Sequence, residues 1–380
     1  MLLVHKVVVL FSSVTVISVI ATDPCFESRY LQAVPKDHLF HTKTKPLVIG
    51  HRGNPVRYQE NTLEGFTSLL GTNADGFELD IYLTKDEELV CFHDDNTKFL
   101  TGEEHVMWET NAEDLTKVYT LQSFNFSGKV YKFDKKRPLP MLKDVLTKMK
   151  DTGKLMYLEM KPSRLRNMTE SNKVGKAVAK LVTEMGLVKQ AMLNSFDPFK
   201  TLAAKRENPD IPIGFFYYSS YWNPSTAKVL RDTIRQLPGM ASCVDTSPSG
   251  VDFIHKMFQS GAAAKSINAS FLDMDYKIYD DPRYSNDTFQ TLRGNYSASI
   301  SAGAWTLYSM KNSDEQDKIQ DVLIDRLVRQ GAERLITDDV YRMLKKLGRP
   351  QTPPISAANY GRVSLSGILL LLFLSFVIYL

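Results

Sequence analysis

The chain has 380 residues, of which 43% are hydrophobic and 24% charged, so it can bury one large core or two ordinary ones. Its 47 basic and 43 acidic side chains nearly cancel and form no long block of one sign, which argues against a nucleic-acid-binding surface. The most basic stretch, residues 131–137, is adequately explained as a solvated loop, and three cysteines are too few for a disulfide-stapled small fold.

Residues 1–21 have the layout of a cleaved secretory signal peptide. A weakly basic start is followed by an apolar run over residues 7–20 and by small residues at the usual processing positions. An N-terminal membrane anchor is the alternative, although the run is short for a span of about 20 residues. Five glycosylation sequons agree with export, at Asn125, Asn167, Asn268, Asn286 and Asn295. Residues 22–45 form an N-terminal segment that precedes the main domain.

Between residues 46 and 347, short apolar runs alternate with segments of helical periodicity. Strands are predicted at residues 46–50, 76–83, 88–93, 154–160, 190–196, 211–218, 240–244, 266–272, 300–307 and 334–337. Helices are predicted at residues 62–70, 139–149, 174–185, 198–206, 226–237 and 319–329. This alternation predicts one α/β domain with a parallel sheet, and about eight units favour a closed (β/α)8 TIM barrel. An open doubly wound sheet remains the alternative, because residues 239–295 are irregular. Cys91 lies within a strand pattern and is expected to be a buried thiol.

The C-terminal part of the chain resembles an anchor-attachment signal. Residues 348–364 contain three prolines and predict a stalk, and residues 365–380 form an apolar tail. Small residues at 356–358 and a polar spacer precede this tail, which together predict attachment of a GPI anchor. A tail that stays in the bilayer is the alternative. Both interpretations predict that the protein lies on the extracellular face of the plasma membrane. A GPI-anchored protein would be secreted if its anchor were released.

Polar side chains gather where the predicted strands end. They are His51, Arg52, Glu78, Asp80, His93, Glu159 and Lys161. In a barrel of parallel strands, the carboxyl ends of all strands meet at one mouth, where active sites are built. We therefore expect these seven side chains to face one space.

This combination of residue types predicts phosphoryl-transfer chemistry on a metal ion. Three carboxylates repel one another unless a cation lies among them, and oxygen ligands favour one divalent cation, Mg²⁺ or Ca²⁺. Arg52 and Lys161 are suited to bind a phosphate. Two histidines beside it can act as general base and general acid.

Each motif also has a plainer explanation when it is taken alone. His93 could be structural, Glu78 and Asp80 could form a charged strand edge, and Glu159 with Lys161 could be a surface ion pair. The functional hypothesis depends on their joint placement at successive strand ends.

The same residues resemble the signature of the glycerophosphodiester phosphodiesterase family over most of the stretch from Leu47 to Leu347. The matching motifs are His51-Arg52-Gly53, Glu60-Asn61-Thr62, Glu78-Leu79-Asp80, His93-Asp94 and Glu159-Met160-Lys161, with weaker matches at Ser195-Phe196, Ala304-Trp305-Thr306 and Ile336-Thr337-Asp338. The resemblance implies a TIM barrel and hydrolysis of glycerophosphodiesters, such as glycerophosphocholine, to an alcohol and glycerol 3-phosphate. Gln59 departs from the family pattern, which often has proline before Glu-Asn-Thr.

The resemblance also implies a role for each matched position. Glu78, Asp80 and Glu159 would hold the metal, with Glu60 beside it in the same shell. His51 and His93 would be the catalytic acid/base pair, and Arg52 and Lys161 would bind phosphate. Trp305 would form a wall of the substrate pocket, where its ring suits a glycerol or a choline-like group.

Three other functions stay open. A lysophospholipase-D-like or sphingomyelinase-D-like phosphodiesterase would use a similar barrel and site on lysolipids or sphingolipids. A glycosidase could use Glu159 together with Glu78 or Asp80, but it has little need of two histidines and two cations. A non-catalytic surface-binding protein is the third. The expected partners are a small-molecule phosphodiester or lysolipid and a membrane, with no nucleic acid.

Overall fold

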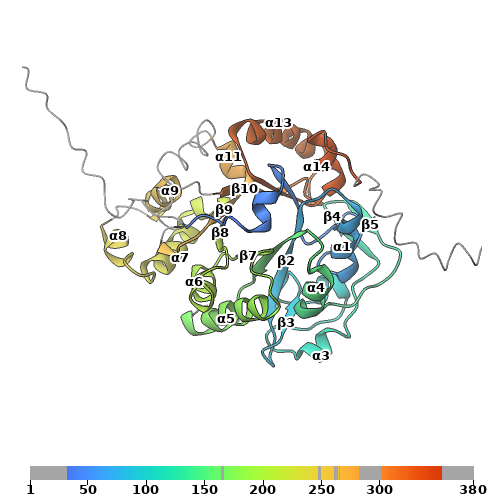
Figure 1. Cartoon of the computed structure of the whole chain (residues 1–380), viewed down its shortest axis with the longest axis horizontal. Helices are drawn as coiled ribbons and strands as arrows, with labels where there is room; N and C mark the ends of the chain where they lie inside the picture. The colour runs from blue at the N-terminus through green and yellow to red at the C-terminus, as the bar shows by residue number, and fades with distance from the viewer. Residues whose placement is uncertain are drawn as a thin grey trace, which may run out of the picture.

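The computed structural model describes residues 32–163, 167–246, 250–260, 264, 266–281 and 301–352 (Figure 1). The predicted signal peptide, the tail, the attachment site and the sequons at Asn286 and Asn295 lie outside these residues. Within the described part of the chain, no helix combines the length and the apolar character that crossing a membrane requires.

Eight parallel strands form the core sheet and confirm the predicted barrel. In spatial order they are β7 (Ala191–Asn194), β6 (Leu155–Met160), β2 (Gly76–Leu83), β1 (Leu47–Gly50), β11 (Arg334–Thr337), β10 (Ser301–Leu307), β9 (Phe271–Asp275) and β8 (Gly214–Tyr217). A parallel bridge between Leu193 and Ile213 brings the first and last strands of this order together. The sheet therefore closes nearly completely on itself, which excludes the open doubly wound alternative.

Helices surround the sheet, as Figure 1 shows. They are α1 (Leu63–Thr67), α4 (Leu142–Met149), α5 (Met168–Glu184), α6 (Pro198–Glu207), α7 (Pro224–Arg235), α8 (Ala241–Asp245), α9 (Gly250–Ser260), α11 (Tyr276–Asp280), α13 (Asp314–Gln330) and α14 (Val340–Lys346). Short 3-10 helices are η1 (Leu39–Thr42), η2 (Ser68–Gly71) and η3 (Ser219–Trp222). Polar caps start several of these helices: Ser313 and Gln316 form a capping box at α13, and the Asn167 side chain accepts the Glu170 N–H at α5.

An excursion over residues 94–141 leaves the barrel after β3 (Leu89–Cys91), which pairs antiparallel with β2. It contains α2 (Lys98–Thr101), α3 (Ala112–Leu115) and the hairpin β4 (Ser123–Phe126) with β5 (Lys129–Lys132), and it has an apolar cluster of its own. This unit was not predicted from the sequence. The prediction of a solvated loop over residues 131–137 is wrong for Arg137, whose side chain is 1% exposed and is hydrogen-bonded to Gln59 and Asp134.

Two predicted strands differ from the structure. Residues 240–244 were expected to be a strand but form α8, whose Cys243 and Val244 are buried. A five-residue apolar run cannot separate a buried strand from a buried helical turn by periodicity. The strand predicted at 266–272 starts only at Phe271 and runs to Asp275. Cys91 is a buried free thiol, as expected, and Cys243 is disulfide-bonded.

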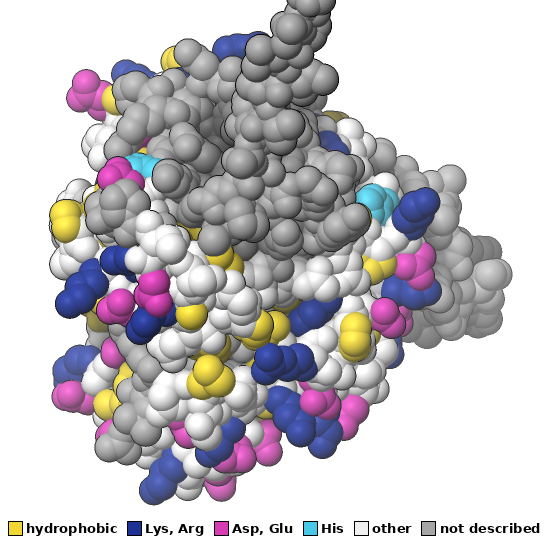
Figure 2. Space-filling view, turned by 90° about the vertical axis from the view of Figure 1, so that its left-hand side faces the viewer, with side chains coloured by type: hydrophobic (Ala, Val, Ile, Leu, Met, Phe, Trp, Pro, Cys, Tyr) yellow, Lys and Arg dark blue, Asp and Glu magenta, His cyan; other side chains and the backbone are white. Residues whose placement is uncertain are grey.

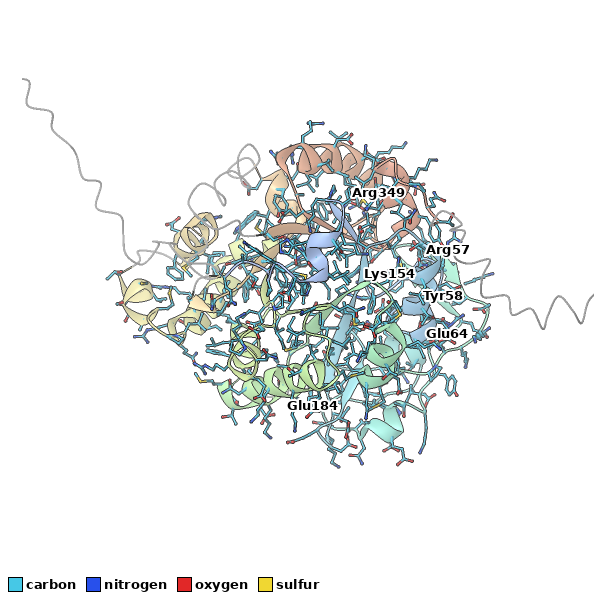
Figure 3. The ribbon with its side chains drawn as sticks, in the orientation of Figure 1. Arg57, Tyr58, Glu64, Lys154, Glu184 and Arg349 are labelled. Carbon is cyan, nitrogen blue, oxygen red and sulfur yellow. The ribbon has the colours of Figure 1, made fainter. Side chains whose placement is uncertain are left out.

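Charged residues hold the connection between β1 and β2 in place. Lys154 and Arg349 are labelled in Figure 3. Lys154 Nζ donates to the carbonyls of Thr72 and Ala74, and the Arg349 guanidinium lies 2.8 Å from the Asp75 carboxylate. On the face in Figure 2, basic and acidic side chains are interspersed among the described residues, in keeping with the near balance of charge.

Candidate active site

A tight turn after β1 presents the first two functional side chains. Gly53 has φ +95° and Arg52 has φ +54°, both in the left-handed region, and the Gly53 N–H donates to the Gly50 carbonyl at 3.2 Å. A β-carbon on Gly50 would lie 2.0 Å from the Gly53 oxygen, so the turn excludes a side chain there. This geometry places His51 and Arg52 at the mouth of the barrel, where they line a cavity of about 450 Å³.

The three predicted metal ligands lie together at this mouth. Asp80 of β2 and Glu159 of β6 are directly paired across the parallel strands, and Glu78 lies two residues earlier on β2. Each carboxylate offers one oxygen, and these oxygens lie within 4.8 Å of one another. All three residues are buried, and Glu78 Oε1 has no hydrogen-bond partner among the described residues.

The electrostatics of this cluster fit a divalent cation. Burial raises the pKa of Glu78 well above its usual value, and the neighbouring charges of Asp80 and Glu159 raise it further. Three buried carboxylates supply the oxygen ligands that Mg²⁺ or Ca²⁺ prefers, and one of their oxygens, Glu78 Oε1, has no hydrogen-bond partner among the described residues. Bringing a cation here would relieve the repulsion that the protein otherwise carries in its interior.

A lysine and a side-chain amide lie beside the carboxylates. Lys161 Nζ lies 2.8 Å from Glu159 and 3.3 Å from Asp80. Although burial alone would raise the pKa of Asp80, nearby positive groups, led by Lys161, hold it below its usual range. Asn61 donates from its amide to Asp80 Oδ2 at 2.7 Å and accepts the Asp80 N–H at 3.1 Å, and so orients this carboxylate.

Arg52 links the β1 turn to the metal cluster. Its backbone N–H donates to Glu78 Oε2 at 2.8 Å, and its Nη1 donates to Glu60 Oε1 at 2.9 Å. Glu60 lines the same cavity, and its carboxylate binds the Arg52 guanidinium. It is not one of the three carboxylates close enough to share an ion, which are Glu78, Asp80 and Glu159. Glu60 thus orients Arg52 toward the cavity.

Each predicted catalytic histidine has a carboxylate on its Nδ1. The distance is 2.6 Å both for His51 to Asp338 and for His93 to Asp94. Asp338 has a side-chain exposure of 8% and Asp94 one of 40%, so only the His51 partner is shielded from water. Burial, followed by the charges of Arg52 and Lys161, lowers the pKa of His93. In both rings the carboxylate contacts Nδ1 and not Nε2.

Aromatic side chains form the opposite wall of the cavity. Trp305 stacks on Tyr218 with ring centroids 5.7 Å apart and planes 11° apart, and it meets Phe196 and Phe216 edge-on at 5.5 and 5.6 Å. The Trp305 indole N–H donates to the Asp273 carbonyl at 3.1 Å, which fixes the ring. The predicted wall at Trp305 is therefore part of a four-ring cluster.

A second cavity of about 900 Å³ adjoins the first. The two cavities share four lining residues, namely His93, Glu159, Lys161 and Phe196. The far part of the second cavity is lined by apolar side chains from α2, α6, η3 and α7, namely Phe99, Phe199, Tyr221, Val229 and Leu230. A group bound at the carboxylates thus has two compartments beside it, one with an aromatic wall and a larger one with an apolar part.

Comparison with known proteins assigns the family. Residues 51–281 match the model of the glycerophosphoryl diester phosphodiesterase family, and this stretch is more than half of the chain. The chain belongs to this family. It is 30% identical over 183 residues to a glycerophosphodiester phosphodiesterase of Caldanaerobacter subterraneus, a match that covers 47% of this chain and 70% of that relative. It is 26% identical over 167 residues to the human lysophospholipase D GDPD1, covering 44% of this chain and 50% of that relative.

Solved structures of family members share the fold. A phosphodiesterase of Oleispira antarctica, determined in complex with the product sn-glycerol-3-phosphate, superimposes with a TM-score of 0.55 at 17% identity, over 80% of this chain and 97% of that one. A glycerophosphoryl diester phosphodiesterase of Parabacteroides distasonis gives a TM-score of 0.52 at 18% identity, over 87% and 96% of the two chains. At these identities, the likeness concerns the fold alone.

The structure brings together all nine residues that the family resemblance singled out, and it adds others. Asp338 and Asn61 had been noticed only as letters of motifs, without a role. Asp338 follows the last strand of the barrel, and a carboxylate at that point of the chain was a usable signal. Tyr218 and Phe216 carry no comparable signal, because an aromatic residue at a strand end is as common in a core as in a pocket.

Proposed function

We propose that this member of the family hydrolyses glycerophosphodiesters such as glycerophosphocholine, releasing the alcohol and glycerol 3-phosphate, with Mg²⁺ or Ca²⁺ as cofactor. The observation that carries the proposal is the buried cluster of Glu78, Asp80 and Glu159. An arginine and a lysine lie directly beside it, and two histidines line the same cavity. When bound there, a divalent cation supplies charge neutralisation at the phosphoryl oxygens.

The side chains of the chain perform the proton transfers. Arg52 and Lys161 orient the phosphodiester by charge-assisted hydrogen bonds. One of His51 and His93 takes a proton from the nucleophile at Nε2 as the new P–O bond forms. The other donates a proton to the alcohol oxygen as its P–O bond breaks. The carboxylate on each Nδ1 holds the ring so that Nε2 faces the cavity.

The test is turnover of glycerophosphocholine by the purified protein with Mg²⁺, Ca²⁺ or EDTA, read as released choline and glycerol 3-phosphate. His51→Ala and His93→Ala should each lower kcat on the order of 100-fold or more while the protein stays folded. His105→Ala is the matched control, because His105 lines neither cavity. Activity that survives EDTA, or a histidine variant with near-normal kcat, contradicts the mechanism.

A lysolipid is the second candidate substrate, and the adjoining 900 Å³ cavity favours it. A free glycerophosphodiester leaves the apolar part of this cavity unused, whereas one hydrocarbon chain gains roughly 0.8 kcal/mol for each methylene buried there. Val229→Trp should obstruct this part and reduce turnover of lysophosphatidylcholine but not of glycerophosphocholine. Val322→Trp on α13 is the control, since Val322 is exposed and lines neither cavity. Equal effects on both substrates would exclude this role for the cavity.

We further propose that the protein is exported, glycosylated and tethered at the cell surface by a GPI anchor. The terminal segments support this, and so does the disulfide at Cys243, since disulfides persist in oxidising compartments. Asn125, Asn167 and Asn268 are exposed, as glycosylation requires. Release from intact cells by a phosphatidylinositol-specific phospholipase tests the anchor, and a mobility shift after enzymatic deglycosylation tests the sugars. A protein that stays in the cell, without sugar, would contradict both.

A further inference from the structure

Asp338 contacts two parts of the active site at once. Its Oδ1 lies 2.6 Å from His51 Nδ1, and its Oδ2 accepts the backbone N–H of Met310 at 2.7 Å. Its own backbone N–H donates to the Leu307 carbonyl at 3.2 Å. The carboxylate is buried, so water does not compete for either oxygen.

The Met310 contact matters because Met310 belongs to a loop that lines the substrate cavity. This loop, residues 308–313, joins β10 to α13, and three of its residues face the cavity, namely Ser309, Met310 and Lys311. From the excursion, the Tyr131 hydroxyl also donates to the Met310 carbonyl at 3.2 Å. The loop thus lines the cavity beside Asp338 and contacts this carboxylate through the Met310 N–H.

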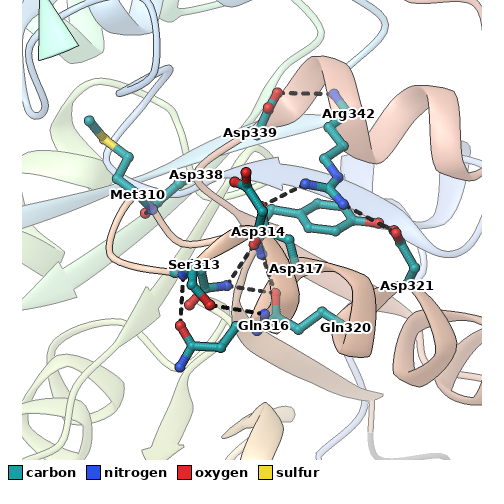
Figure 4. Close-up of polar contacts among 12 residues, drawn as sticks. Met310, Ser313, Asp314, Gln316, Asp317, Gln320, Asp321, Asp338, Asp339 and Arg342 are labelled. Atoms are coloured by element: carbon teal, nitrogen blue, oxygen red, sulfur yellow. Dashed lines mark hydrogen bonds and ion pairs between the residues drawn. The ribbon is translucent and has the colours of Figure 1, made fainter. Parts of the chain in front are cut away.

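The far side of the loop is bound to α13, and α14 is bound in turn to α13, as Figure 4 shows. Tyr308 donates its N–H to Gln320 Oε1 at 2.6 Å, and the Asn312 amide donates to Asp317 at 2.9 Å and to Gln320 at 3.1 Å. Arg342 of α14 donates to Asp317 at 2.6 Å and to Asp321 at 3.1 Å. These bonds anchor both ends of the loop and leave its centre, at Met310, to be held by Asp338 and Tyr131.

We infer that Asp338 is a positioning residue that fixes the catalytic imidazole of His51 and the cavity loop 308–313 relative to each other. A carboxylate that accepts the Nδ1–H of a histidine fixes the tautomer whose Nε2 lone pair is free for the reaction. The second oxygen of the same group sets where Met310 and its neighbours meet the substrate. The position of the His51 ring and the position of the cavity loop are thereby coupled through one side chain. The inference rests on the proposed function in that His51 acts on the phosphodiester.

The kinetic test uses Asp338→Ala and the isosteric Asp338→Asn. Asp338→Ala removes both acceptors and should lower kcat on the order of 10- to 100-fold and raise KM. Asp338→Asn keeps one acceptor and should have the smaller effect of the two. Asp339→Asn is the matched control, because Asp339 caps α14 through the Arg342 N–H, a role that asparagine also fills, and should leave kcat and KM unchanged.

A double-mutant cycle with His51→Ala separates the two contacts. In the His51→Ala protein, Asp338→Ala should no longer lower kcat, because the ring that it positions is gone, but it should still raise KM through the loop. If Asp338→Ala lowers kcat by the same factor in the His51→Ala protein as in the wild type, the role at His51 is overturned. An unchanged KM in both backgrounds would overturn the role at the loop.

The ¹⁵N spectrum of the imidazoles tests the inference without turnover. The His51 signals, identified by their loss in His51→Ala, should report protonated Nδ1 in the wild type and a mixture of tautomers in Asp338→Ala. If the tautomer of His51 is the same in both proteins, the inference fails even if the enzyme hydrolyses glycerophosphodiesters. If wild-type turnover is absent but the tautomer changes as expected, the proposed function fails while the positioning role stands.

Discussion

At the scale of single residues, this site places like charges next to one another in the protein interior. Glu78, Asp80 and Glu159 lie within 4.8 Å at their closest oxygens, and Lys161 compensates two of them. A buried charge without full compensation destabilises the fold by several kcal/mol. The energetic consequences of this arrangement can be measured in the absence of substrate.

Glu78→Gln should separate metal binding from stability. Without divalent cation, the variant should unfold at the same or a higher temperature than the wild type, because one of three repelling carboxylates is neutral. With cation at 100 times its dissociation constant, the wild type should gain about 2.7 kcal/mol and the variant much less. Since the pKa of Glu78 is raised, acidification protonates the ligand and should weaken cation binding.

Thermal unfolding with EDTA, Mg²⁺ or Ca²⁺ at several pH values measures this effect. Glu88→Gln is the control, since Glu88 is exposed in the turn between β2 and β3. A cation-induced gain of equal size in both variants would exclude the cluster as the binding site.

His38 should make the protein sensitive to acid. Burial lowers its pKa from 6.5 to about 4, although the hydrogen bond between its Nε2 and the Ala191 carbonyl acts in the opposite direction. Its Nδ1 accepts the Phe40 N–H at 3.1 Å. The unfolded chain therefore binds a proton more tightly than the folded one, so stability is lost as pH falls from 6.5 to about 4. The loss can reach about 3 kcal/mol.

Denaturant titrations at pH 7 and pH 4.5 measure this loss. In His38→Asn, which retains a side chain able to cap η1, the difference between the two pH values should shrink. An unchanged difference would assign the acid sensitivity to other groups.

At the scale of elements, the fold depends on close contacts between neighbouring helices and between the excursion and the barrel. The close approach of α5 and α6 depends on Gly175, where a β-carbon would lie 2.2 Å from the Lys200 carbonyl oxygen and 2.9 Å from the Ala203 β-carbon. The excursion is similarly held to the barrel, because the Gln59 amide donates to the Leu121 and Lys135 carbonyls while its oxygen accepts from Arg137. Gln59, which stands where the family often has proline, thus binds the excursion to the barrel next to Glu60.

Gly175→Ala should destabilise the protein, although alanine is favoured over glycine in a helix by about 1 kcal/mol. The overlap with a backbone oxygen forces the two helices apart, and overpacking of this kind costs about 1–3 kcal/mol or more. We expect a net loss of about 2 kcal/mol in the free energy of unfolding, measured by denaturant titration. Glu184→Ala, on an exposed position of the same helix and labelled in Figure 3, should change it by less than about 0.5 kcal/mol. A stabilised Gly175→Ala variant would show that the helices can separate at little cost.

At the scale of the whole molecule, the two ends of the barrel domain are joined by long-range contacts. Arg349 follows α14 and returns to Asp75 beside β2, 274 residues earlier in the chain. The Asn73 side chain donates to the carbonyls of Pro350 and Thr352. Residues 349–352, which the sequence suggested as the start of a stalk, are therefore bound to the barrel.

Arg349→Ala should lower the free energy of unfolding by about 1–3 kcal/mol, because it leaves the buried Asp75 with the Val48 N–H as its remaining partner among the bonds described. Adding Asp75→Asn should recover part of this loss, since the uncompensated charge is then removed. Chemical denaturation of the two single variants and the double variant measures the coupling. Additive losses would mean that the ion pair contributes nothing to closing the domain.

Much of the barrel and of its site could be predicted because short, local sequence patterns indicate the strands and the polar residues at their ends. The strands β1, β2 and β11 were located nearly to the residue, since an apolar run bounded by polar residues marks a buried strand. The ligands and histidines were found because parallel strands bring their carboxyl ends to one mouth. The strand predicted at 240–244 failed because the same apolar run also suits a buried helical turn. The burial of Arg137 was missed because its partner Gln59 lies 78 residues away in the sequence.

The sequence by itself determined the order of strands and helices, the family of the chain and the residue types at the active site, because each of these depends on neighbours a few positions apart. Only the tertiary structure decided that Asp338 contacts both His51 and Met310, that four aromatic rings form one wall, and that a second, larger cavity adjoins the carboxylates. These features join segments that are up to 287 residues apart. Contacts at such separations are set by how the whole barrel closes, which no local pattern of side chains contains.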